Sequence, residues 1–351
     1  MRVGLDATPL LGTRTGVGTY VAGLLGALHG VTPVLTAFTW RGVDALPAGY
    51  ARAPRRFSAR ALQELWLRTD WPPVELLSGP VDVFHGTNFV LPPTRRAAGV
   101  VTVHDLTYEH HADTVTPASL RYRTLVPRAL RRGALALALT NAGAADLRER
   151  YDLPEERVMV TPLGVGEQWF APPGARPPGL PSEYLLFVGS LEPRKNLPVL
   201  LDAVRRLPDA PPLVLAGPPG WGPAVESAPG VLTPGYLAGE RLVAAVAHAS
   251  ALVLPSRYEG FGLPPLEALA AGTPVVVSDL PVLREVLGEH GAYAAVGDAD
   301  ALADALGRVL RTGDGGPAAR VARTAYAREF TWERCAAATV AAYERARTMA
   351  A

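Results

Sequence analysis

The feature that most constrains the fold is a repeated alternation of short apolar runs with segments of helical periodicity. In the first half, apolar runs lie at 2–6, 34–39, 81–85, 99–104, 134–140 and 158–161, with helical segments at 18–28, 117–132 and 142–151. In the second half, runs lie at 184–189, 213–216, 231–233, 251–255, 274–278 and 292–295, with helical segments at 197–207, 239–248, 264–271, 281–287 and 299–310 and two more near the C-terminus. Buried parallel strands have continuous apolar runs, and the helices between them cover the faces of the sheet. The sequence therefore predicts an α/β protein with two Rossmann-like, doubly wound domains.

A stretch rich in proline and glycine separates the two halves. At 351 residues the chain exceeds what one core usually organises, so two domains are expected. We predict an N-terminal domain at 1–171, a linker at 172–181, a C-terminal domain at 182–330, and a final helix at 331–351 that packs back on the N-terminal domain. Parallel sheets bind ligands beyond the carboxyl ends of their strands, so two facing sheets predict a site in the cleft between them.

Composition and charge favour a globular protein that does not bind nucleic acid. Hydrophobic residues make up 48% of the chain and charged residues 19%, which favours well-buried cores. The formal net charge of +1 provides no field that would attract nucleic acid. Arginines cluster at Arg52, Arg55, Arg56 and Arg60 and again across 121–132. This Arg-rich surface of the N-terminal domain either faces anionic lipid or forms ordinary solvated helix faces.

Cysteine content and hydropathy indicate a location. Cys335 is the single cysteine, and the N-terminus begins like a strand rather than a signal peptide. No apolar run approaches the roughly 18–20 residues that span a bilayer. We expect a cytoplasmic protein whose membrane association, if any, is peripheral and on the inner face.

One lysine stands alone among the basic residues. Of the 34 basic side chains, Lys195 is the single lysine and all others are arginine. A compact ammonium differs from a planar guanidinium in how it binds a point charge, so this position either requires an ammonium or retains one by chance.

Residues 254–269 have the pattern of a strand, a loop and a helix start. Two prolines preset the helical φ, and the free amides around Gly262 and Leu263 are expected to point outward at the positive helix end, an anion-binding geometry. Glu259 lies in the loop and Glu267 in the expected first helical turn, where carboxylates suit the recognition of diols. The alternative is that Glu267 complements the helix dipole and Glu259 is a solvated loop residue.

A second strand end carries two adjacent cations. Arg194 and Lys195 follow the apolar run that ends near Gly189 and precede a helix. Fixed cations at that position can neutralise a diphosphate and stabilise the charge that builds on a nucleoside diphosphate as it leaves an anomeric carbon. No metal is then required.

These two motifs together resemble family 4 of the retaining glycosyltransferases, a GT-B group of glycosyl transferases group 1 with mannosyltransferase-like members. The spacing of Glu259 and Glu267 matches the family's Glu-x7-Glu pattern, and 189–196 matches its Gly-Ser-Leu-x-x-Arg-Lys-Asn setting. The resemblance implies two Rossmann-like domains facing across a cleft. It further implies that Arg194 and Lys195 bind the donor diphosphate, Glu259 the donor sugar and Glu267 the ribose, with the backbone of Phe261, Gly262 and Leu263 and the Gly189 strand end near the phosphates.

The N-terminal half supplies weaker signals. Gly16 and Gly18 lie in a stretch that resembles the family's glycine loop near the donor phosphates, whereas Val21 at the third position fails the Gly-x-Gly-x-x-Gly fingerprint of nicotinamide enzymes. His104 and Asp105 match a His-Asp pair of the family near the transferred sugar. The resemblance implies that His104 is catalytic together with Arg194, Lys195 and Glu259, touching the donor sugar or helping to order the acceptor, and a histidine satisfied at a strand end is the alternative. Asn88, in a strand-end loop at 85–89, and Asp105 are candidates for the acceptor side.

Three other patterns carry no predicted chemistry. Asp298 and Asp300 resemble a metal-binding Asp-x-Asp, but they open a helical pattern and are expected to supply an N-cap and first-turn charge. His110 and His111 with Asp113 lack a helical metal-ligand spacing. No Gly-Lys-Ser or Gly-Lys-Thr occurs, so a P-loop is excluded. We expect no metal and no cofactor, because the nucleotide-sugar donor is a substrate.

The resulting prediction is a retaining, metal-independent hexosyltransferase. Its donor is a nucleotide-diphosphate sugar, with GDP-mannose placed ahead of UDP-sugars. Its acceptor is a hydroxyl of a sugar, a lipid-linked sugar or a small molecule, in glycan, glycolipid, polysaccharide or natural-product biosynthesis. Two alternatives stay open: a sugar-nucleotide epimerase of the same fold, and a catalytically inactive nucleotide-sugar-binding protein.

Overall fold

The described part of the chain forms two compact units. The computed structural model describes residues 1–39, 42–53, 58–221, 228–312 and 316–350. The first unit comprises Met1–His110, Pro117–Gly164 and Thr331–Ala351, and the second comprises His111–Thr116 and Val165–Phe330.

The first unit is built on a parallel sheet of seven strands in the order β3-β2-β1-β4-β5-β6-β7. The strands are β1 (Arg2–Asp6), β2 (Thr32–Thr36), β3 (Ala51–Arg52), β4 (Val83–Gly86), β5 (Ala98–Thr102), β6 (Leu135–Ala138) and β7 (Val158–Val160). All six strands expected in this half are present, with bounds shifted by a few residues. The two-residue strand β3 was missed because both of its residues are exposed and it has no apolar run. The strand order reverses at β1, so the neighbouring ends of β1 and β4 form a topological switch point.

Helices connect these strands. They are α1 (Gly16–Ala27), α2 (Ala59–Trp66), α3 (Glu75–Ser78), α4 (Thr107–His110), α5 (Tyr122–Arg131), α6 (Asn141–Tyr151) and α13 (Trp332–Ala350), with 3₁₀ turns at Thr8–Leu10, Val43–Ala45, Ser119–Arg121 and Glu155–Arg157. The 3₁₀ turn at Ala112–Thr114 belongs to the second unit. The helix expected at 117–132 begins later, at Tyr122, because a separate 3₁₀ turn precedes it. Thr140 starts α6 as a side-chain cap, since its hydroxyl accepts a hydrogen bond from the amide of Gly143.

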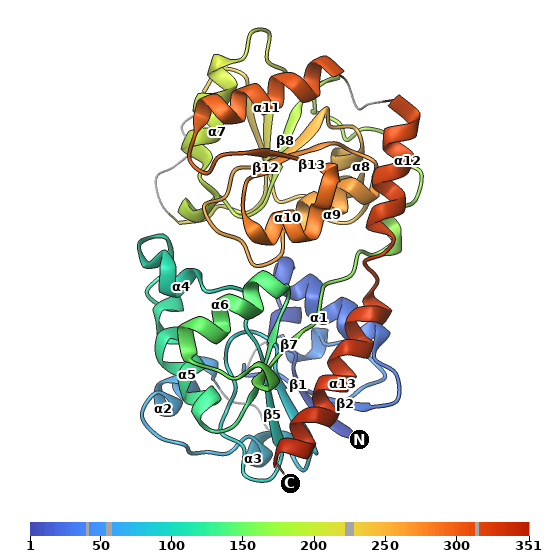
Figure 1. Cartoon of the computed structure of the whole chain (residues 1–351). Helices are drawn as coiled ribbons and strands as arrows, with labels where there is room; N and C mark the ends of the chain where they lie inside the picture. The colour runs from blue at the N-terminus through green and yellow to red at the C-terminus, as the bar shows by residue number, and fades with distance from the viewer. Residues whose placement is uncertain (40–41, 54–57, 222–227, 313–315, 351) are drawn as a thin grey trace. The chain divides into compact units, whose positions relative to one another are not determined.

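The C-terminal helix α13 is an integral part of the first unit, where it packs on α1 and on strands β4, β5 and β6 (Figure 1). Its Tyr343 hydroxyl lies 2.8 Å from Nδ1 of His85, whose Nε2 lies 2.7 Å from the hydroxyl of Thr102. At the start of α13, the Trp332 ring lies so close to Gly23 on α1 that any side chain there would clash. Buried polar and apolar contacts therefore join the last 19-residue helix to the first sheet.

The second unit is built on a parallel sheet of six strands in the order β10-β9-β8-β11-β12-β13. The strands are β8 (Leu185–Val188), β9 (Leu213–Ala216), β10 (Val231–Gly235), β11 (Ala251–Leu254), β12 (Val275–Ser278) and β13 (Gly291–Ala294). Each matches an expected apolar run. The two central strands, β8 and β11, are neighbours in this sheet, although more than sixty residues separate them in sequence. Their carboxyl ends consequently lie side by side.

The described residues of the second unit form six helices. They are α7 (Leu197–Arg206), α8 (Glu240–Ala247), α9 (Leu263–Ala270), α10 (Pro281–Leu287), α11 (Ala299–Thr312) and α12 (Gly316–Ala327), with 3₁₀ turns at Glu167–Trp169, Pro193–Lys195 and Gly288–His290. Of these helices, α12 packs on α9. Figure 1 shows α7 and α11 on one face of the sheet and α9 on the other. Asp298 caps α11 through a hydrogen bond from the amide of Ala301, and Asp300 lies in its first turn, as expected for this pair.

The boundary between the units differs from the expected one. The first unit ends at Gly164 rather than at 171, and residues 172–181 lie inside the second unit. The reason is that the chain bonds to the second unit from Val165 onward, where its amide donates to the carbonyl of Phe330 at 3.0 Å. The adjoining Glu167–Trp169 turn packs on α9.

Candidate functional site

The main candidate site lies at the carboxyl edge of the second unit's sheet, beyond strands β8 and β11. The chain leaves β8 into the 3₁₀ turn Pro193–Lys195, and it leaves β11 into the loop that leads to α9. A backbone hydrogen bond from the amide of Arg257 to the carbonyl of Arg194 joins the two loops at 2.9 Å. Parallel pairing of β8 with β11 thus brings together two motifs that are distant in sequence.

Glu259 is the centre of a buried ionic cluster. Its Oε1 lies 2.6 Å from Nζ of Lys195, and its Oε2 lies 3.1 Å from Nη1 of Arg194. The hydroxyl of Ser256 donates to the same Oε1 at 2.6 Å. Arg194 also donates to the carboxylate of Glu192 at 2.7 Å. The two cations are therefore held by two carboxylates before any ligand arrives.

Electrostatics keep Glu259 ionised despite its burial. Burial alone would raise its pKa, but the positive charges of Lys195 and Arg194 and the hydrogen bonds from Lys195 and Ser256 lower that pKa to about 2. Glu259, Lys195 and Ser256 are all buried. A carboxylate with this many donors is a weak base and a weak nucleophile, so the cluster is suited to fixing charge rather than to accepting a proton.

Glycines keep the space beside Lys195 open. Gly189 follows β8 with a φ of 154°, and a Cβ there would lie 3.7 Å from Cε of Lys195 and 3.3 Å from Cζ of Phe187. A Cβ at Gly217, after the neighbouring strand β9, would collide with the carbonyl oxygen of Gly189 at 1.9 Å. The close backbone approach at this edge therefore requires glycine at position 217, whereas glycine is favoured at position 189 by its positive φ.

The start of α9 presents backbone amides at the same edge. Gly262 is the N-cap with a φ of 89°, and a Cβ there would lie 2.4 Å from Cδ2 of Leu283. Neither its amide nor that of Leu263 donates to any residue that the structure describes. The two prolines that follow have no N–H, so these two amides carry the donor capacity of the helix start. Phe261 immediately precedes Gly262. Its side chain is buried, and its ring contacts that of Phe330 edge to face.

Glu267 differs from its expected placement in the first helical turn. It is the fifth residue of α9, beyond the first turn, and its side chain is buried. Burial raises its pKa to about 8, which a hydrogen bond from the side chain of Trp169 offsets only in part. The dipole interpretation is thus wrong for Glu267, because its carboxyl is neutral near pH 7 and does not complement a positive helix end.

Sequence reasoning missed four side chains of this site: Glu192, Asn196, Ser256 and Trp169. Asn196 has a φ of 57° and caps α7, and its side-chain Nδ2 is buried without a hydrogen-bond partner among the described residues. Ser256 lies three residues before Glu259, a spacing that could have indicated a hydrogen bond. Trp169 gave no local signal, because its place beside α9 depends on where the chain crosses into the second unit.

The first unit holds the other predicted residues. Nε2 of His104 lies 2.8 Å from the carbonyl oxygen of Thr87, so Nε2 carries the proton and Nδ1 is the acceptor in the neutral ring. Burial lowers the pKa of His104, although Thr87 and the charge of Asp105 act in the opposite direction. Asp105 accepts a hydrogen bond from the amide of Thr107 at 2.9 Å, which positions it at the start of α4.

The other predicted positions of the first unit are two glycines and an asparagine. Gly18 must be glycine because a Cβ would approach the carbonyl of Pro9 at 2.8 Å, whereas Gly16 has open space around it. Asn88 lines a small cavity of the first unit. The predicted residues thus fall into two groups: Gly16, Gly18, Asn88, His104 and Asp105 in the first unit, and Gly189, Arg194, Lys195, Glu259, Phe261, Gly262, Leu263 and Glu267 in the second.

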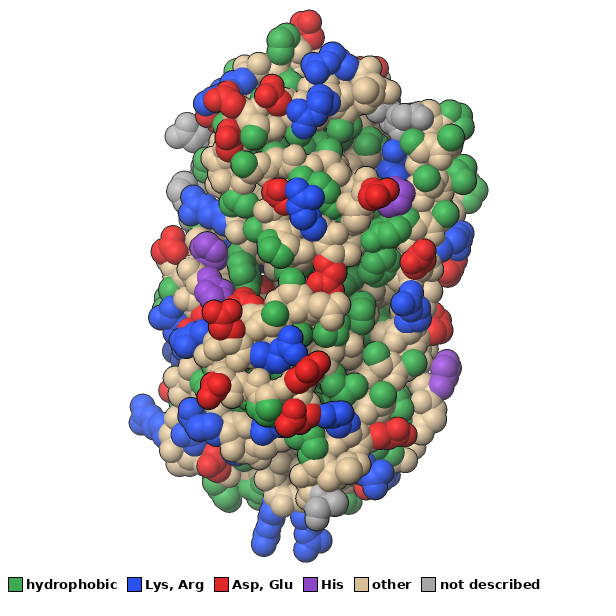
Figure 2. All heavy atoms as spheres, viewed as in Figure 1, with side chains coloured by type: hydrophobic (Ala, Val, Ile, Leu, Met, Phe, Trp, Pro, Cys, Tyr) green, Lys and Arg blue, Asp and Glu red, His purple; other side chains and the backbone are tan. Residues whose placement is uncertain are grey.

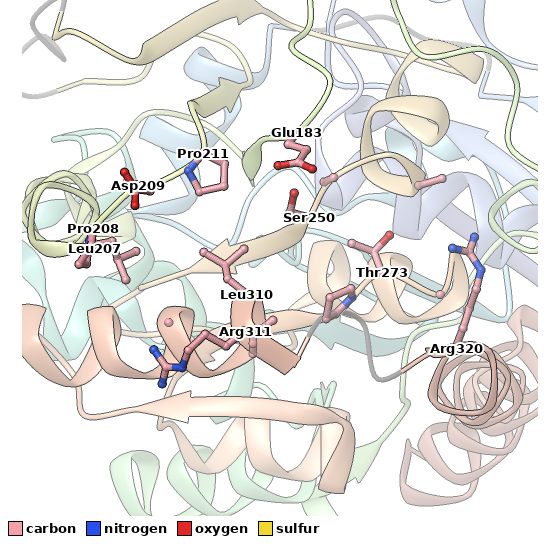
Figure 3. A pocket seen from close by; sticks show the side chains of 16 residues that line it. Glu183, Leu207, Pro208, Asp209, Pro211, Ser250, Thr273, Leu310, Arg311 and Arg320 are labelled. Carbon is pink, nitrogen blue, oxygen red and sulfur yellow. The ribbon is translucent and has the colours of Figure 1, made fainter.

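A larger cavity of about 670 Å³ lies at the opposite, amino-terminal edge of the second sheet. Its lining includes Glu183 and Ser250, which precede strands, as well as Arg311 and Arg320 (Figure 3). Helices α7, α8, α9 and α11 end around it, and helix C-termini carry partial negative charge. This cavity is therefore a poor site for a diphosphate, despite its size.

The Arg-rich surface of the first unit is partly neutralised by acidic partners. Arg121 pairs with Glu64 at 2.6 Å, and Arg128 and Arg132 both pair with Asp70 at 2.9 and 3.0 Å. Of the other cluster, Arg55 and Arg56 lie outside the described residues. Figure 2 shows acidic and basic side chains interspersed on the face that it presents. Lipid contact through this surface stays a prediction, and none of the described helices is long and apolar enough to cross a bilayer.

Metal-binding side chains are not grouped in the part of the chain that the structure describes. No set of three or more His, Cys, Asp or Glu side chains there could hold an ion. His110, part of the His-His-Asp pattern, instead lies 2.9 Å from the carboxylate of Asp146.

Comparison with known families and proteins agrees with this geometry. Residues 14–169 match the family described as Glycosyltransferase Family 4, and residues 182–312 match Glycosyl transferases group 1. The chain is 31% identical to O-antigen chain mannosyltransferase B of Escherichia coli over 289 residues, which cover 75% of this chain and 74% of that protein. It is 33% identical to the MMP alpha-(1->4)-mannosyltransferase of Mycolicibacterium hassiacum, over 60% of this chain and 54% of that protein.

Solved structures show the same fold at low identity. Sucrose-phosphate synthase from Thermosynechococcus elongatus superposes with a TM-score of 0.73 at 20% identity, covering 98% of each chain. Anabaena HepE, solved in complex with UDP and glucose, gives a TM-score of 0.68 at 16% identity, covering 97% of this chain and 98% of that one. The two parallel sheets of this chain are thus the two Rossmann-like sheets of the GT-B fold.

Proposed function

The chain belongs to glycosyltransferase family 4, and on that premise we propose that it is a retaining, metal-independent hexosyltransferase. Its donor would be a nucleotide-diphosphate sugar, and its acceptor a hydroxyl of a sugar, a lipid-linked sugar or a small molecule. The observation that carries this proposal is the cluster of Arg194, Lys195 and Glu259 beside the free amides of Gly262 and Leu263. Cations and amides at one sheet edge form a diphosphate site.

The two cations suit the leaving group. When the bond between the anomeric carbon and the diphosphate breaks, negative charge develops on the phosphate oxygens. Arg194 and Lys195 are already oriented by Glu192 and Glu259, so little reorganisation is needed as that charge forms. Fixed cations thereby supply the stabilisation that other enzymes take from a divalent ion. We infer that no metal and no cofactor take part.

The state of Glu259 supports a front-face route to retention. Its pKa of about 2 makes it a poor base and a poor nucleophile, so a covalent glycosyl-enzyme through this residue is disfavoured. In the proposed step, the acceptor oxygen bonds to the anomeric carbon on the face that the diphosphate leaves. The acceptor proton passes to the departing phosphate oxygen. Glu259 would meanwhile bind the donor sugar's hydroxyls.

Glu267 is proposed to bind the ribose of the donor. Because its carboxyl is neutral near pH 7, it can donate one hydrogen bond and accept others from a diol. The similarity to two mannosyltransferases supports a mannose donor, so GDP-mannose is placed first and UDP-sugars next. In the first unit, His104 offers the free acceptor Nδ1 for a substrate hydroxyl, with Asp105 and Asn88 on the acceptor side.

A donor panel tests this function. The protein is incubated with GDP-mannose, UDP-glucose, UDP-N-acetylglucosamine and dTDP-rhamnose, with and without sugar acceptors and with EDTA. Acceptor-dependent release of nucleoside diphosphate that resists EDTA is expected, and NMR of the product should show the donor's anomeric configuration. Isomerisation of the donor without an acceptor would indicate an epimerase. Nucleotide binding without turnover would indicate an inactive binding protein, and an inverted product would refute retention.

A further inference from the structure

The chain turns sharply at Phe89, shortly after β4, in a backbone conformation that favours glycine. Phe89 has a φ of 61°, and the amide of Val90 donates across it to the carbonyl of Asn88 at 2.7 Å. A hydrogen bond over two residues with a positive φ between them is the pattern of the classic γ-turn, which is rare and strained. Gly86 leaves room for this turn, because a Cβ there would lie 2.1 Å from the carbonyl oxygen of Val90. Glycine would adopt the φ of Phe89 without a steric penalty, so the phenylalanine keeps a strain that glycine would relieve.

Two hydrogen bonds join this turn to the end of β5. The amide of Phe89 donates to the carbonyl of Thr102, the last residue of β5, at 3.0 Å. Two residues further along, Nε2 of His104 donates to the carbonyl of Thr87 at 2.8 Å. The turn and the imidazole therefore fix each other. Strained residues persist where the surrounding structure over-determines them, and they cluster at functional sites.

The ring of Phe89 is one of two aromatic rings that pack on His104. Its centroid lies 5.4 Å from that of the imidazole, and the ring of Tyr20 on α1 lies at 5.3 Å, both close to perpendicular to it. The Phe89 ring is itself held, because it stacks on Tyr122 at 4.6 Å and meets Tyr108 edge to face at 5.7 Å. Loss of the Phe89 ring would therefore free the imidazole to rotate and admit water beside it.

The ring nitrogen Nδ1 of His104 is left for a ligand. It has no hydrogen-bond partner among the described residues, and it is not sealed from solvent, because the side chain is only half-buried. Burial lowers the pKa of His104, so near pH 7 its ring is neutral and Nδ1 is an acceptor.

The titratable groups around His104 come from neighbouring elements. The charge of Asp105, the next residue, raises the pKa of His104. His85 on β4 is neutral because burial lowers its pKa to about 3, and the Tyr20 hydroxyl is neutral because burial raises its pKa. The ring of Phe89 is thus a part of this environment that can be replaced without changing any charge.

We propose that Phe89 is a positioning residue, whose strained turn and ring hold the imidazole of His104 in one orientation with Nδ1 open to a substrate hydroxyl. Phe89 acts through His104. This assignment rests on the proposed transferase function, because that function supplies the hydroxyl. The alternative is that the ring only packs the turn, in which case its loss would lower stability and leave the state of His104 unchanged.

NMR of the histidine side chains tests the assignment in the protein without substrate, with His104→Gln to identify the signals of His104. In the wild type the tautomer with the proton on Nε2 should predominate, and the pKa of His104 should lie below its ordinary value. Phe89→Leu should mix the tautomers, raise that pKa and lower kcat roughly tenfold, with nucleoside diphosphate binding unchanged. Phe89→Tyr keeps the ring and should keep the wild-type tautomer, pKa and kcat.

Further variants separate the ring from the strain. Phe89→Gly should melt at a higher temperature than Phe89→Ala, because both lack the ring and only glycine relaxes the φ of 61°. Phe89→Met is a second variant without the ring, for use if Phe89→Leu does not fold. Tyr293→Leu removes a half-buried ring from β13 in the second unit and should leave His104 and kcat unchanged. Far-UV circular dichroism checks that each variant folds.

Two results would overturn the proposal. One is a tautomer and pKa of His104 in Phe89→Leu and Phe89→Met that match the wild type, whatever happens to kcat. The other is Phe89→Tyr behaving like the variants without the ring. The proposed function fails separately, since a wild-type protein that transfers no sugar would refute it while the NMR signals of His104 still decide the role of Phe89.

Discussion

Nζ of Lys195 lies 2.6 Å from Oε1 of Glu259, and both side chains are buried at the edge of the second sheet. This pair joins the chain's single lysine to the first glutamate of the Glu-x7-Glu motif. Arg194 completes the cluster from the same loop as Lys195. The two motifs that suggested a diphosphate site therefore form one site.

Removal of the lysine charge should lower turnover. In Lys195→Met, loss of a fixed cation at the leaving group should lower kcat about 10²–10³-fold, the usual effect of deleting one transition-state donor. Arg205→Met removes an exposed cation from the end of α7 and serves as the matched control. Steady-state kinetics with the best donor measure both variants. If Lys195→Met turned over within about threefold of wild type, the assignment of Lys195 would be wrong.

The stability of the cluster should be strongly coupled. Glu259→Gln leaves two buried cations without their shared anion and should cost about 3–5 kcal/mol of unfolding free energy. In the double variant with Lys195→Met the cost should be smaller than the sum, with a coupling of about 2 kcal/mol. Urea denaturation of the four proteins completes the cycle. Additive effects would show that the 2.6 Å contact contributes nothing in solution.

Glu267 should give the protein a distinct loss of stability with rising pH. Its pKa is about 8 in the folded protein and 4.5 in an unfolded chain, so between these values the folded state holds the extra proton. Its contribution is present in full below pH 4.5 and is lost as the pH rises to 8, a cost of a few kcal/mol. Thermal unfolding of Glu267→Gln and wild type across this range should converge at low pH and separate at high pH. Parallel curves would contradict the raised pKa.

Trp169 offers a second readout of the same group. Because its hydrogen bond lowers the pKa of Glu267, Trp169→Phe should move the midpoint of that pH dependence upward. Trp221→Phe also loses an indole hydrogen bond, to the carbonyl of Thr114 at 2.9 Å, and should leave the midpoint unchanged.

Gly262 should tolerate no side chain. Its φ of 89° and the 2.4 Å approach to Leu283 predict that Gly262→Ala costs about 2–5 kcal/mol and weakens nucleotide binding. Gly297→Ala has a similar φ of 78° and open space around it, so it should cost about 1 kcal/mol and leave nucleotide binding intact. Thermal shift with and without GDP compares them. Equal destabilisation of the two variants would show that the contact with Leu283 does not contribute to the cost.

Loss of the Tyr343 hydroxyl should weaken the packing of the C-terminal helix α13 on the first sheet. Tyr343→Phe leaves Nδ1 of His85 buried without its partner, at a cost of about 1–3 kcal/mol. Hydrogen exchange along α13 should rise relative to α6. Tyr50→Phe is the control, because the Tyr50 hydroxyl donates only a long hydrogen bond of 3.4 Å to the carbonyl of Leu25. It should leave the stability and the exchange in α13 nearly unchanged. Unchanged exchange in α13 would show that its docking does not depend on His85.

Local sequence patterns determined the elements and the motifs of this protein. Apolar runs predicted twelve of the thirteen strands that the structure describes, because buried parallel strands have no polar face to interrupt them. The two-residue β3 escaped because it is exposed. Glu259, Lys195 and Gly262 were identifiable because strand ends and helix starts require particular residue types.

Tertiary structure alone decided how these residues act. The sequence did not indicate that Glu259 is ionised and Glu267 protonated, because burial and the proximity of Lys195 set their pKa values in opposite directions. Nor did it indicate Trp169 beside α9, or Asp6, Gln63 and Asn88 around one cavity, since strand order brings these together. A local sequence pattern reflects the residue types that a helix, strand or turn requires. The electrostatic potential and the solvation at a side chain instead depend on neighbours that are distant in the chain.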